Sequence, residues 1–229
     1  MTESEPTVLM ERDGHVAIVT LNRPERLNAF NGQIHDEFEA TLGDLNRDSD
    51  VRCVVITGSG RAFCAGADLK EMNERNQARG DAPYPRGFDL NATMPFSRCP
   101  KPIIAAVNGL CLAGGLERAL DCDIRICSTE AYFGLFEVKR GILPGYAIHH
   151  LARLVPFGDA MYLMLTADRV QPDDALRMGL VREVLEPDAL MPRAVEIAEM
   201  IGANAPLAVE GAKFMGQQWR QLQIDESYR

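Results

Sequence analysis

The chain has 229 residues, of which 46% are hydrophobic and 25% are charged. These proportions are typical of a globular protein with one large domain, or one domain with an appendage. They exclude a collagen, a coiled coil and a mainly disordered chain. Acidic residues outnumber Lys and Arg by 33 to 24, for a formal net charge of −9. Because phosphate backbones and acidic lipids repel such a chain, we expect neither nucleic acid nor a membrane as a partner.

The N-terminal residues carry no basic region followed by an apolar one, as a secretion signal would, and no run of about 18 apolar residues occurs in the chain. We therefore predict a cytoplasmic protein. The 6 cysteines include no Cys-x-x-Cys pair, which favours reduced, buried thiols over disulfides or structural zinc. They are Cys53, Cys64, Cys99, Cys111, Cys122 and Cys127.

An Asp13-Gly14 pair separates two β-rich runs, and it predicts a hairpin of strands over residues 7–10 and 15–21. Apolar residues at helical spacing then predict a surface helix over 33–45. The continuous apolar run at 51–57 is typical of a strand that is buried on both faces.

Small residues dominate positions 58–68, which indicates a loop, and a helix is predicted to follow over 69–77. Glycines and prolines in 79–91 predict a mobile surface loop within the domain. A second cycle begins with a strand over 103–107 and continues through a small-residue turn at 108–115 into a helix.

This helix is predicted to end near Leu120, with strands at 123–128 and 131–133 before a turn at 141–145. The rest is predicted to be helical apart from a strand at 182–185, with helices over 147–154, 158–165, 172–178, 187–203 and 206–221. Strands that alternate with helices predict an α/β fold, whose repeated unit is a strand, a glycine-rich turn and a helix.

Two of the glycine-rich turns, 60–70 and 106–117, follow a buried strand and precede a helix. Backbone N–H groups at such a place lack intrahelical partners, and small residues keep them open to a ligand. Two facing turns would form an oxyanion hole from the N–H groups of Ala67 and Gly114. The alternative, which glycine content alone favours, is that the glycines only let helix and strand pack closely.

Two acidic residues have apolar neighbours in the sequence. Glu117 follows small and apolar residues, and Glu137 ends the aromatic stretch Tyr-Phe-Gly-Leu-Phe-Glu. Either these carboxylates pair with Arg118, Arg125 or Arg140 in ordinary salt bridges, or they have separated pKa values and act as acid and base. The residues by themselves leave both interpretations open.

Six ordered segments resemble the crotonase family, also called the enoyl-CoA hydratase/isomerase superfamily. They are LNRPERLNA (21–29), FCAGADLKEM (63–72), KPIIAAVNG (101–109), GGLERALDCD (114–123), GILPG (141–145) and ALRMGLV (175–181). The resemblance implies an α/β crotonase-like superhelix of repeated ββα units over 1–185 and a helical C-terminal region over 186–229. That region would be used in trimerisation, commonly within a hexamer of two trimers. It also implies an acyl-CoA thioester as substrate, with no metal or redox cofactor.

Carried onto this chain, the resemblance assigns the oxyanion hole to the N–H groups of Ala67 and Gly114. Hydratases of the family resemble this chain in having glutamates at both acidic positions, which implies hydration of a trans-2-enoyl-CoA to a 3-hydroxyacyl-CoA. Glu117 would be the general base on the water that attacks C3, and Glu137 would give a proton to C2. Both carboxyls would hold the same water.

The resemblance also implies where the substrate binds. Residues 65–70 would follow the pantetheine arm, Arg26 would lie near the CoA nucleotide, and 79–91 would border the acyl pocket and set chain-length preference. The residues expected to bind substrate are Arg26, Ala65, Ala67, Asp68, Leu69, Lys70 and Gly114.

Three features depart from the family pattern. Tyr146-Ala-Ile-His-His150 replaces a small, glycine-rich run and is one residue shorter, which could reshape the acyl pocket. Arg118 stands where the family usually has an apolar residue, and its charge would lower the pKa of Glu117 if the two meet. The chain ends at Arg229, before the family's usual C-terminal segment, so we expect a truncated chain or a missing tail. An intact mass above 25.3 kDa would support this expectation.

Other interpretations are weaker. A dinucleotide site would need a third glycine where Phe63 stands. His149 and His150 point about 100° apart on a helix, which favours a helix surface or subunit interface over a metal site. Cys64 is expected to be a small buried thiol rather than a nucleophile.

Two other classes of function stay open. One is a different crotonase reaction, such as dehydration of a hydroxyacyl-CoA like carnitinyl-CoA, or double-bond isomerisation. The other is a non-catalytic CoA-binding or scaffold protein, against which the two glutamates argue.

Overall fold

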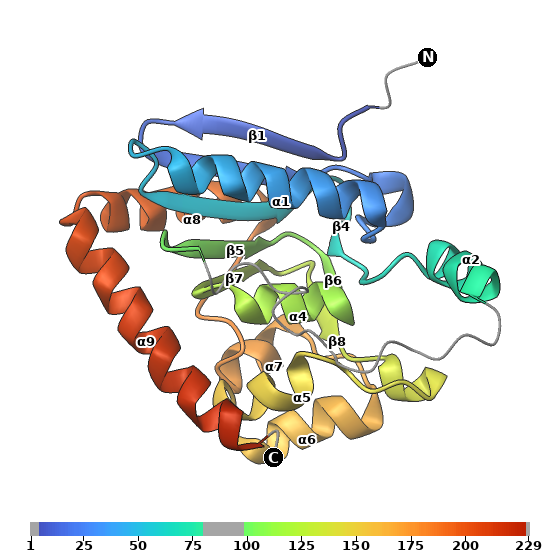
Figure 1. Cartoon of the computed structure of the whole chain (residues 1–229). Helices are drawn as coiled ribbons and strands as arrows, with labels where there is room; N and C mark the ends of the chain where they lie inside the picture. The colour runs from blue at the N-terminus through green and yellow to red at the C-terminus, as the bar shows by residue number, and fades with distance from the viewer. Residues whose placement is uncertain (1–4, 80–98, 228–229) are drawn as a thin grey trace.

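The computed structural model describes residues 5–79 and 99–227, so most of the predicted loop at 79–91 lies outside the described residues. Two sheets form the centre of the molecule (Figure 1). The larger has the order β1 (Val8–Asp13), β2 (Val16–Leu21), β3 (Cys53–Gly58), β5 (Ile103–Val107), β7 (Ile124–Ser128) and β9 (Val184–Leu185). The smaller has the order β4 (Ala62–Cys64), β6 (Leu110–Leu112) and β8 (Tyr132–Gly134).

Pairs of strands followed by a helix repeat along the chain. The hairpin of β1 and β2 leads to α1 (Gly32–Arg47), β3 and β4 lead to α2 (Leu69–Arg79), and β5 and β6 lead to α4 (Gly114–Asp121). Only β1 and β2 pair in antiparallel fashion, and the other strand pairings in the two sheets are parallel. This topology is the predicted superhelix of ββα units.

The second strands of the second and third units, β4 and β6, were predicted as parts of loops, and that prediction is wrong. β4 lies within 58–68 and β6 within 108–115. Each has only three residues, too few for an alternating pattern, and each pairs with a segment far away in the sequence. The sequence therefore reveals the small residues of these segments but not the strand pairing between them.

The helices after residue 146 agree with the predicted segments to within a few residues, whereas the short 3₁₀ helices η1 and η3 were not predicted. The structure has η1 (Pro24–Arg26), η3 (Glu137–Arg140), α5 (Ala147–His150), η4 (Leu151–Arg153), α6 (Phe157–Thr166), α7 (Pro172–Arg177), α8 (Pro187–Gly202) and α9 (Pro206–Ser227). The segment predicted as one helix over 147–154 divides into α5 and the 3₁₀ turn η4. Among the described helices, none is long and apolar enough to cross a membrane.

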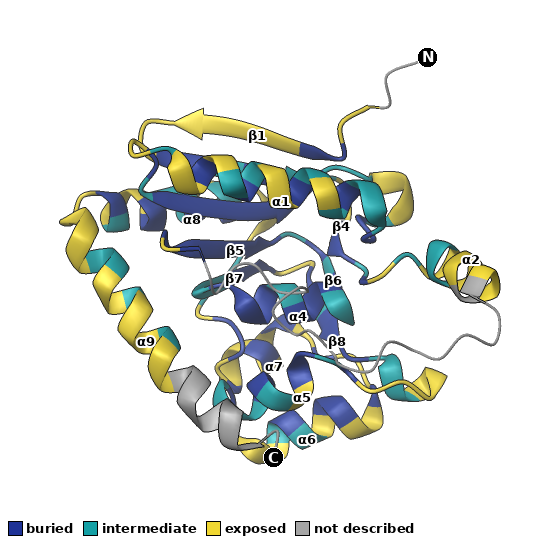
Figure 2. Ribbon diagram, in the orientation of Figure 1, coloured by how far each residue is buried: buried dark blue, intermediate teal, exposed yellow. Residues whose placement is uncertain are grey.

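The central strands of the large sheet are buried on both faces because alternate side chains enter two apolar clusters, whereas the edge strand β1 is mostly exposed. Val54 and Ile56 face the cluster that contains α1 and α4, whereas Cys53 and Val55 face the cluster that contains α8. Figure 2 shows β3 and β5 buried along their lengths. The first helix of the predicted C-terminal region thus packs on the sheet, and the division at residue 185 stays a prediction.

All six cysteines are free and buried, as predicted. Burial raises the pKa of the Cys64 thiol, and the charge of Arg118 lowers it by less. A buried thiol of raised pKa is a poor nucleophile.

Candidate active site

A cavity of about 870 Å³ opens between η1, the start of α1, the residues before α2, the start of α4 and η3. Every residue predicted for the site lines it, although these residues come from four separate segments of the chain. They are Arg26, Ala65, Ala67, Asp68, Leu69, Lys70, Gly114, Glu117 and Glu137.

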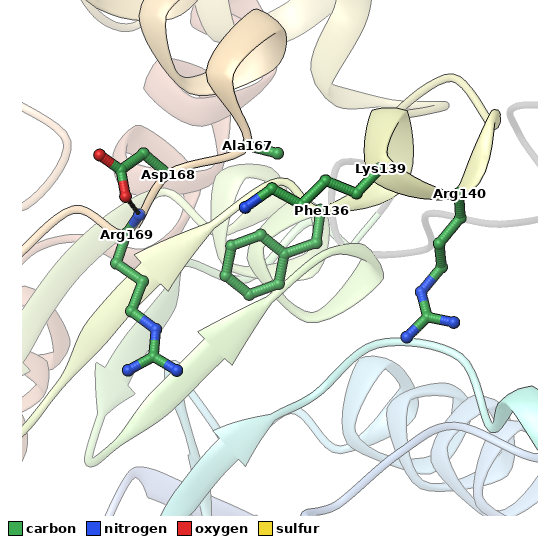
Figure 3. Close-up of a pocket in the computed structure, with 6 residues that line it drawn as sticks. All are labelled: Phe136, Lys139, Arg140, Ala167, Asp168 and Arg169. Carbon is green, nitrogen blue, oxygen red and sulfur yellow. Dashed lines mark hydrogen bonds between the residues drawn. The ribbon is translucent and has the colours of Figure 1, made fainter.

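A second cavity, of about 490 Å³, shares Phe136 and Arg140 with the first (Figure 3). Nζ of Lys139 lies 5.4 Å from the centroid of the Phe136 ring there, and the carboxylate of Asp168 accepts hydrogen bonds from the Tyr162 hydroxyl and the Arg169 amide. Neither glutamate and neither predicted oxyanion amide lines this cavity. We therefore take the larger cavity as the candidate active site.

The two predicted oxyanion amides face one space. Phe30 fixes the backbone on both sides of Ala67. The N–H of Phe30 donates to the carbonyl of Gly66, and the carbonyl of Phe30 accepts from the N–H of Asp68. The N–H of Ala67, which lies between Gly66 and Asp68, therefore points away from Phe30. The second belongs to Gly114, the first residue of α4, where N–H groups have no partner within the helix. A Cβ on Gly114 would lie 3.9 Å from the nitrogen of Ala67.

The glycines around this space serve two purposes. Gly66 has φ +98°, and a Cβ there would lie 3.0 Å from the Cβ of Ala113, so it allows both the turn and the close approach. A Cβ on Gly115 would collide with the carbonyl of Cys64. Gly114 differs, because a Cβ there would meet nothing closer than 3.5 Å. Close packing thus explains Gly115, whereas the packing around Gly114 leaves room for a side chain.

Glu117 enters the cavity from α4 and is only 8% exposed. Its Oε1 accepts a hydrogen bond of 3.0 Å from the N–H of Ala147. Burial raises the pKa of this carboxyl, while the amides of Ala147 and Tyr146 and the charge of Arg118 lower it by less. The predicted effect of Arg118 on this pKa is therefore present but smaller than that of burial.

Glu137 reaches the same cavity from the first residue of η3. Among the described residues, its buried Oε2 has no hydrogen-bond partner. Burial raises the pKa of Glu137 to about 7; its own backbone amide opposes this, and the charge of Glu117 adds to it. In the described part of the chain neither glutamate has an ion-pair partner within 4.0 Å, so the salt-bridge interpretation is not supported.

Comparison with known proteins decides the family. A sequence profile described as enoyl-CoA hydratase/isomerase matches residues 11–224. The short-chain-enoyl-CoA hydratase of Clostridium acetobutylicum is 45% identical, over 95% of this chain and 84% of its own. An enoyl-CoA hydratase structure from Mycobacterium smegmatis superposes with a TM-score of 0.83 at 34% identity, over 97% of this chain and 93% of that one. The chain belongs to the enoyl-CoA hydratase/isomerase family.

This membership confirms the predicted resemblance and the crotonase-like fold. Another relative, the (E)-benzylidenesuccinyl-CoA hydratase of Thauera aromatica, is 41% identical over 90% of this chain and 80% of its own. The family thus includes proteins named for different acyl groups. The assignment of single residues in this chain to the reaction stays a prediction.

Three residues of the segment that departs from the family pattern, Tyr146, Ala147 and His150, are buried. The hydroxyl of Tyr146 donates to Oδ1 of Asp121 at 2.7 Å, and its ring stacks on that of His150 with centroids 3.6 Å apart. His150 is 6% exposed, so the prediction of a helix surface or interface position is wrong for this residue. Stacking against Tyr146, which the sequence does not reveal, is the physical reason.

One supporting residue, Arg23, was missed from the sequence, and so was the helix-capping role of the predicted Asp68. Arg23 donates to the carbonyl of Ala29 and forms a 3.2 Å ion pair with Asp68. The same Asp68 accepts from the amides of Lys70 and Glu71, so it caps α2 as well as lining the cavity. An aspartate three residues before a glutamate is a helix-start signal that could have indicated this role.

Phe30 was also missed, although its backbone holds Ala67 and its ring lines the cavity. It belongs to no predicted strand. Its role comes from an isolated bridge between distant residues, for which the sequence carries no local signal.

Proposed function

We propose that this chain adds water across the double bond of a trans-2-enoyl-CoA to give a 3-hydroxyacyl-CoA. It is an enzyme, a hydro-lyase of the enoyl-CoA hydratase type. One observation supports the proposal above the others: the buried Glu117 and the half-buried Glu137, both with raised pKa values, line a single cavity with the amides of Ala67 and Gly114. The reaction consumes only water and the thioester.

In the proposed mechanism, the thioester carbonyl accepts hydrogen bonds from the amides of Ala67 and Gly114. Ionised Glu117 takes a proton from water as the water oxygen bonds to C3, and the electrons of the double bond move to the carbonyl oxygen. Neutral Glu137 then gives a proton to C2 and the carbonyl reforms. One proton passes from Glu117 back to Glu137 through solvent before the next turnover.

The same cavity would hold the CoA part of the substrate. We propose that Ala65, Leu69 and Lys70 border the pantetheine arm, and that Arg26 lies near the nucleotide. Lys70 and Arg26 are exposed at the mouth, where their charges would attract phosphate groups.

Hydration of crotonyl-CoA tests the proposed function. We expect the purified chain to remove the conjugated thioester absorbance. Glu117→Gln and Glu137→Gln should each lower kcat by about 10²- to 10⁴-fold, the range for a lost general acid or base. Glu130→Gln, an exposed glutamate outside the cavity, is the matched control and should keep full activity.

An inactive wild type that still binds a CoA thioester would overturn hydration, provided that longer enoyl-CoAs are also left unchanged. Dehydration of a hydroxyacyl-CoA or double-bond isomerisation would then be tested with a substrate panel. Full activity in either cavity variant would instead contradict the two-glutamate mechanism.

A further inference from the structure

Arg118 lies in the wall of the candidate active site and has no part in the reaction proposed above. It follows Glu117 on α4, and its side chain is half-buried. It lines the same cavity as Ala67, Gly114 and Glu117. A fixed charge in that position acts on the electrons of a bound substrate without touching it.

Two contacts fix the guanidinium of Arg118. Its Nη1 donates to the carbonyl of Gly114 at 3.1 Å, and its Cζ lies 3.5 Å from the centroid of the Phe30 ring. The backbone of Phe30 is hydrogen-bonded to both neighbours of Ala67. Arg118 therefore joins the two backbone segments that carry the oxyanion amides.

The cation also lies close to the space between those amides. A Cβ on Gly114 would be 3.5 Å from Nη1 of Arg118 and 3.9 Å from the nitrogen of Ala67. The general base Glu117 must be ionised before it reacts, and its negative charge disfavours an oxyanion nearby. A guanidinium, which stays protonated, offsets that charge and favours the oxygen as it becomes negative.

We propose that Arg118 is a positioning residue of the oxyanion hole: its charge, which the contacts with Gly114 and Phe30 hold beside the two amides, polarises the bound thioester carbonyl. This role rests on the proposed function, because it requires a thioester carbonyl between the amides of Ala67 and Gly114. It does not depend on which reaction follows.

Two variants separate charge from hydrogen bonding. Arg118→Gln removes the charge but keeps a donor, whereas Arg118→Lys keeps the charge and loses the planar fork. Arg47→Gln is the control, because it changes the net charge equally at a side chain that is 75% exposed. Each protein is titrated with 4-dimethylaminocinnamoyl-CoA, whose absorption shifts to longer wavelength as its carbonyl is polarised. kcat and KM are measured with crotonyl-CoA.

We expect the wild type, Arg47→Gln and Arg118→Lys to show similar red shifts of the bound probe. Arg118→Gln should show a clearly smaller shift, with kcat about tenfold lower, less than the cost of a lost oxyanion donor, and KM within about twofold. A change in kcat without a change in KM indicates an effect in the transition state.

If Arg118→Gln keeps the red shift and the kcat of the wild type, this role of Arg118 is overturned. Equal losses in Arg118→Gln and Arg118→Lys would also overturn it, because geometry rather than charge would then be responsible. If the wild type binds the probe but does not hydrate crotonyl-CoA, the proposed function fails. The probe shift still decides the role of Arg118.

Discussion

Gly114 and Gly115 stand side by side at the start of α4, yet their surroundings differ. The first faces the space beside the Ala67 amide, and the second packs against the backbone of Cys64. The sequence analysis assigns an oxyanion amide to Gly114 and gives no separate role to Gly115. The structure shows that only Gly115 is required for the close packing of helix and strand.

This difference predicts opposite effects of one added methyl group. Gly114→Ala should fold normally, because its Cβ meets nothing closer than 3.5 Å, but should lose about 10²-fold in kcat as the methyl fills the oxyanion space. Gly115→Ala should lower the free energy of unfolding by about 1–3 kcal/mol, because its Cβ meets a backbone carbonyl. Urea unfolding and crotonyl-CoA turnover of both variants check this. Equal activity in the two would contradict it.

Glu137 also predicts a pH dependence of stability. Its pKa is raised from 4.5 to about 7 in the folded protein, so the folded state binds more protons between these values. Stability therefore falls as pH rises through this window, and Glu137→Gln should remove a penalty on the order of 1–3 kcal/mol at pH 8.

Urea unfolding at pH 4.5 and pH 8 measures this effect, and the variant's gain should appear only at the higher pH. The activity of the wild type should fall above about pH 7, as Glu137 loses the proton meant for C2. A stability difference that does not change with pH would contradict the assignment.

At the scale of elements, α5 and the turn before it contact Glu117, the proposed catalytic base. The amides of Tyr146 and Ala147 both hydrogen-bond to Glu117, and the Tyr146 side chain is fixed by Asp121 and His150. The departure from the family's glycine-rich run thus gives this backbone a new side-chain anchor. The anchor crosses from α5 to α4.

Tyr146→Phe should loosen this backbone while keeping the ring stack. We expect a loss of about 1–3 kcal/mol in stability from the broken buried hydrogen bond. The lower-pH limb of kcat/KM should move to higher pH, because weaker amide bonds let the pKa of Glu117 rise. Tyr162→Phe removes a similar Tyr–Asp bond outside the site and is the control. If the lower-pH limb of kcat/KM does not move in Tyr146→Phe, the anchoring of the backbone around Glu117 by Tyr146 is contradicted.

At the scale of the whole molecule, α9 runs along one side of the body toward the C-terminus (Figure 1). Lys213 attaches it through a 2.7 Å ion pair with Asp123. Several apolar side chains of this helix are exposed at helical spacing. They are Leu207, Phe214, Met215 and Trp219, exposed by 85%, 60%, 65% and 64%.

Such a stripe favours the predicted trimer or hexamer, which would cover it. We expect light scattering after size exclusion to give a multiple of 25.3 kDa for the wild type. Trp219→Asp should shift the protein toward the monomer because it places a charge in an apolar interface. Gln218→Asp, its exposed neighbour, adds the same charge and should keep the wild-type mass. Equal masses for the two variants would contradict an interface through Trp219.

The sequence by itself determined the α/β class, most helices and strands, the buried thiols and a set of residues that line one cavity. Periodic apolar runs and motif order are local properties that a single chain displays. Only the tertiary structure decided that β4 and β6 form a second sheet, because three-residue strands gain their stability from distant partners. It also decided that Phe30 and Arg118 link the two oxyanion segments, and that Tyr146 anchors the backbone around Glu117. These contacts join residues whose spacing carries no signal, and packing alone brings them together.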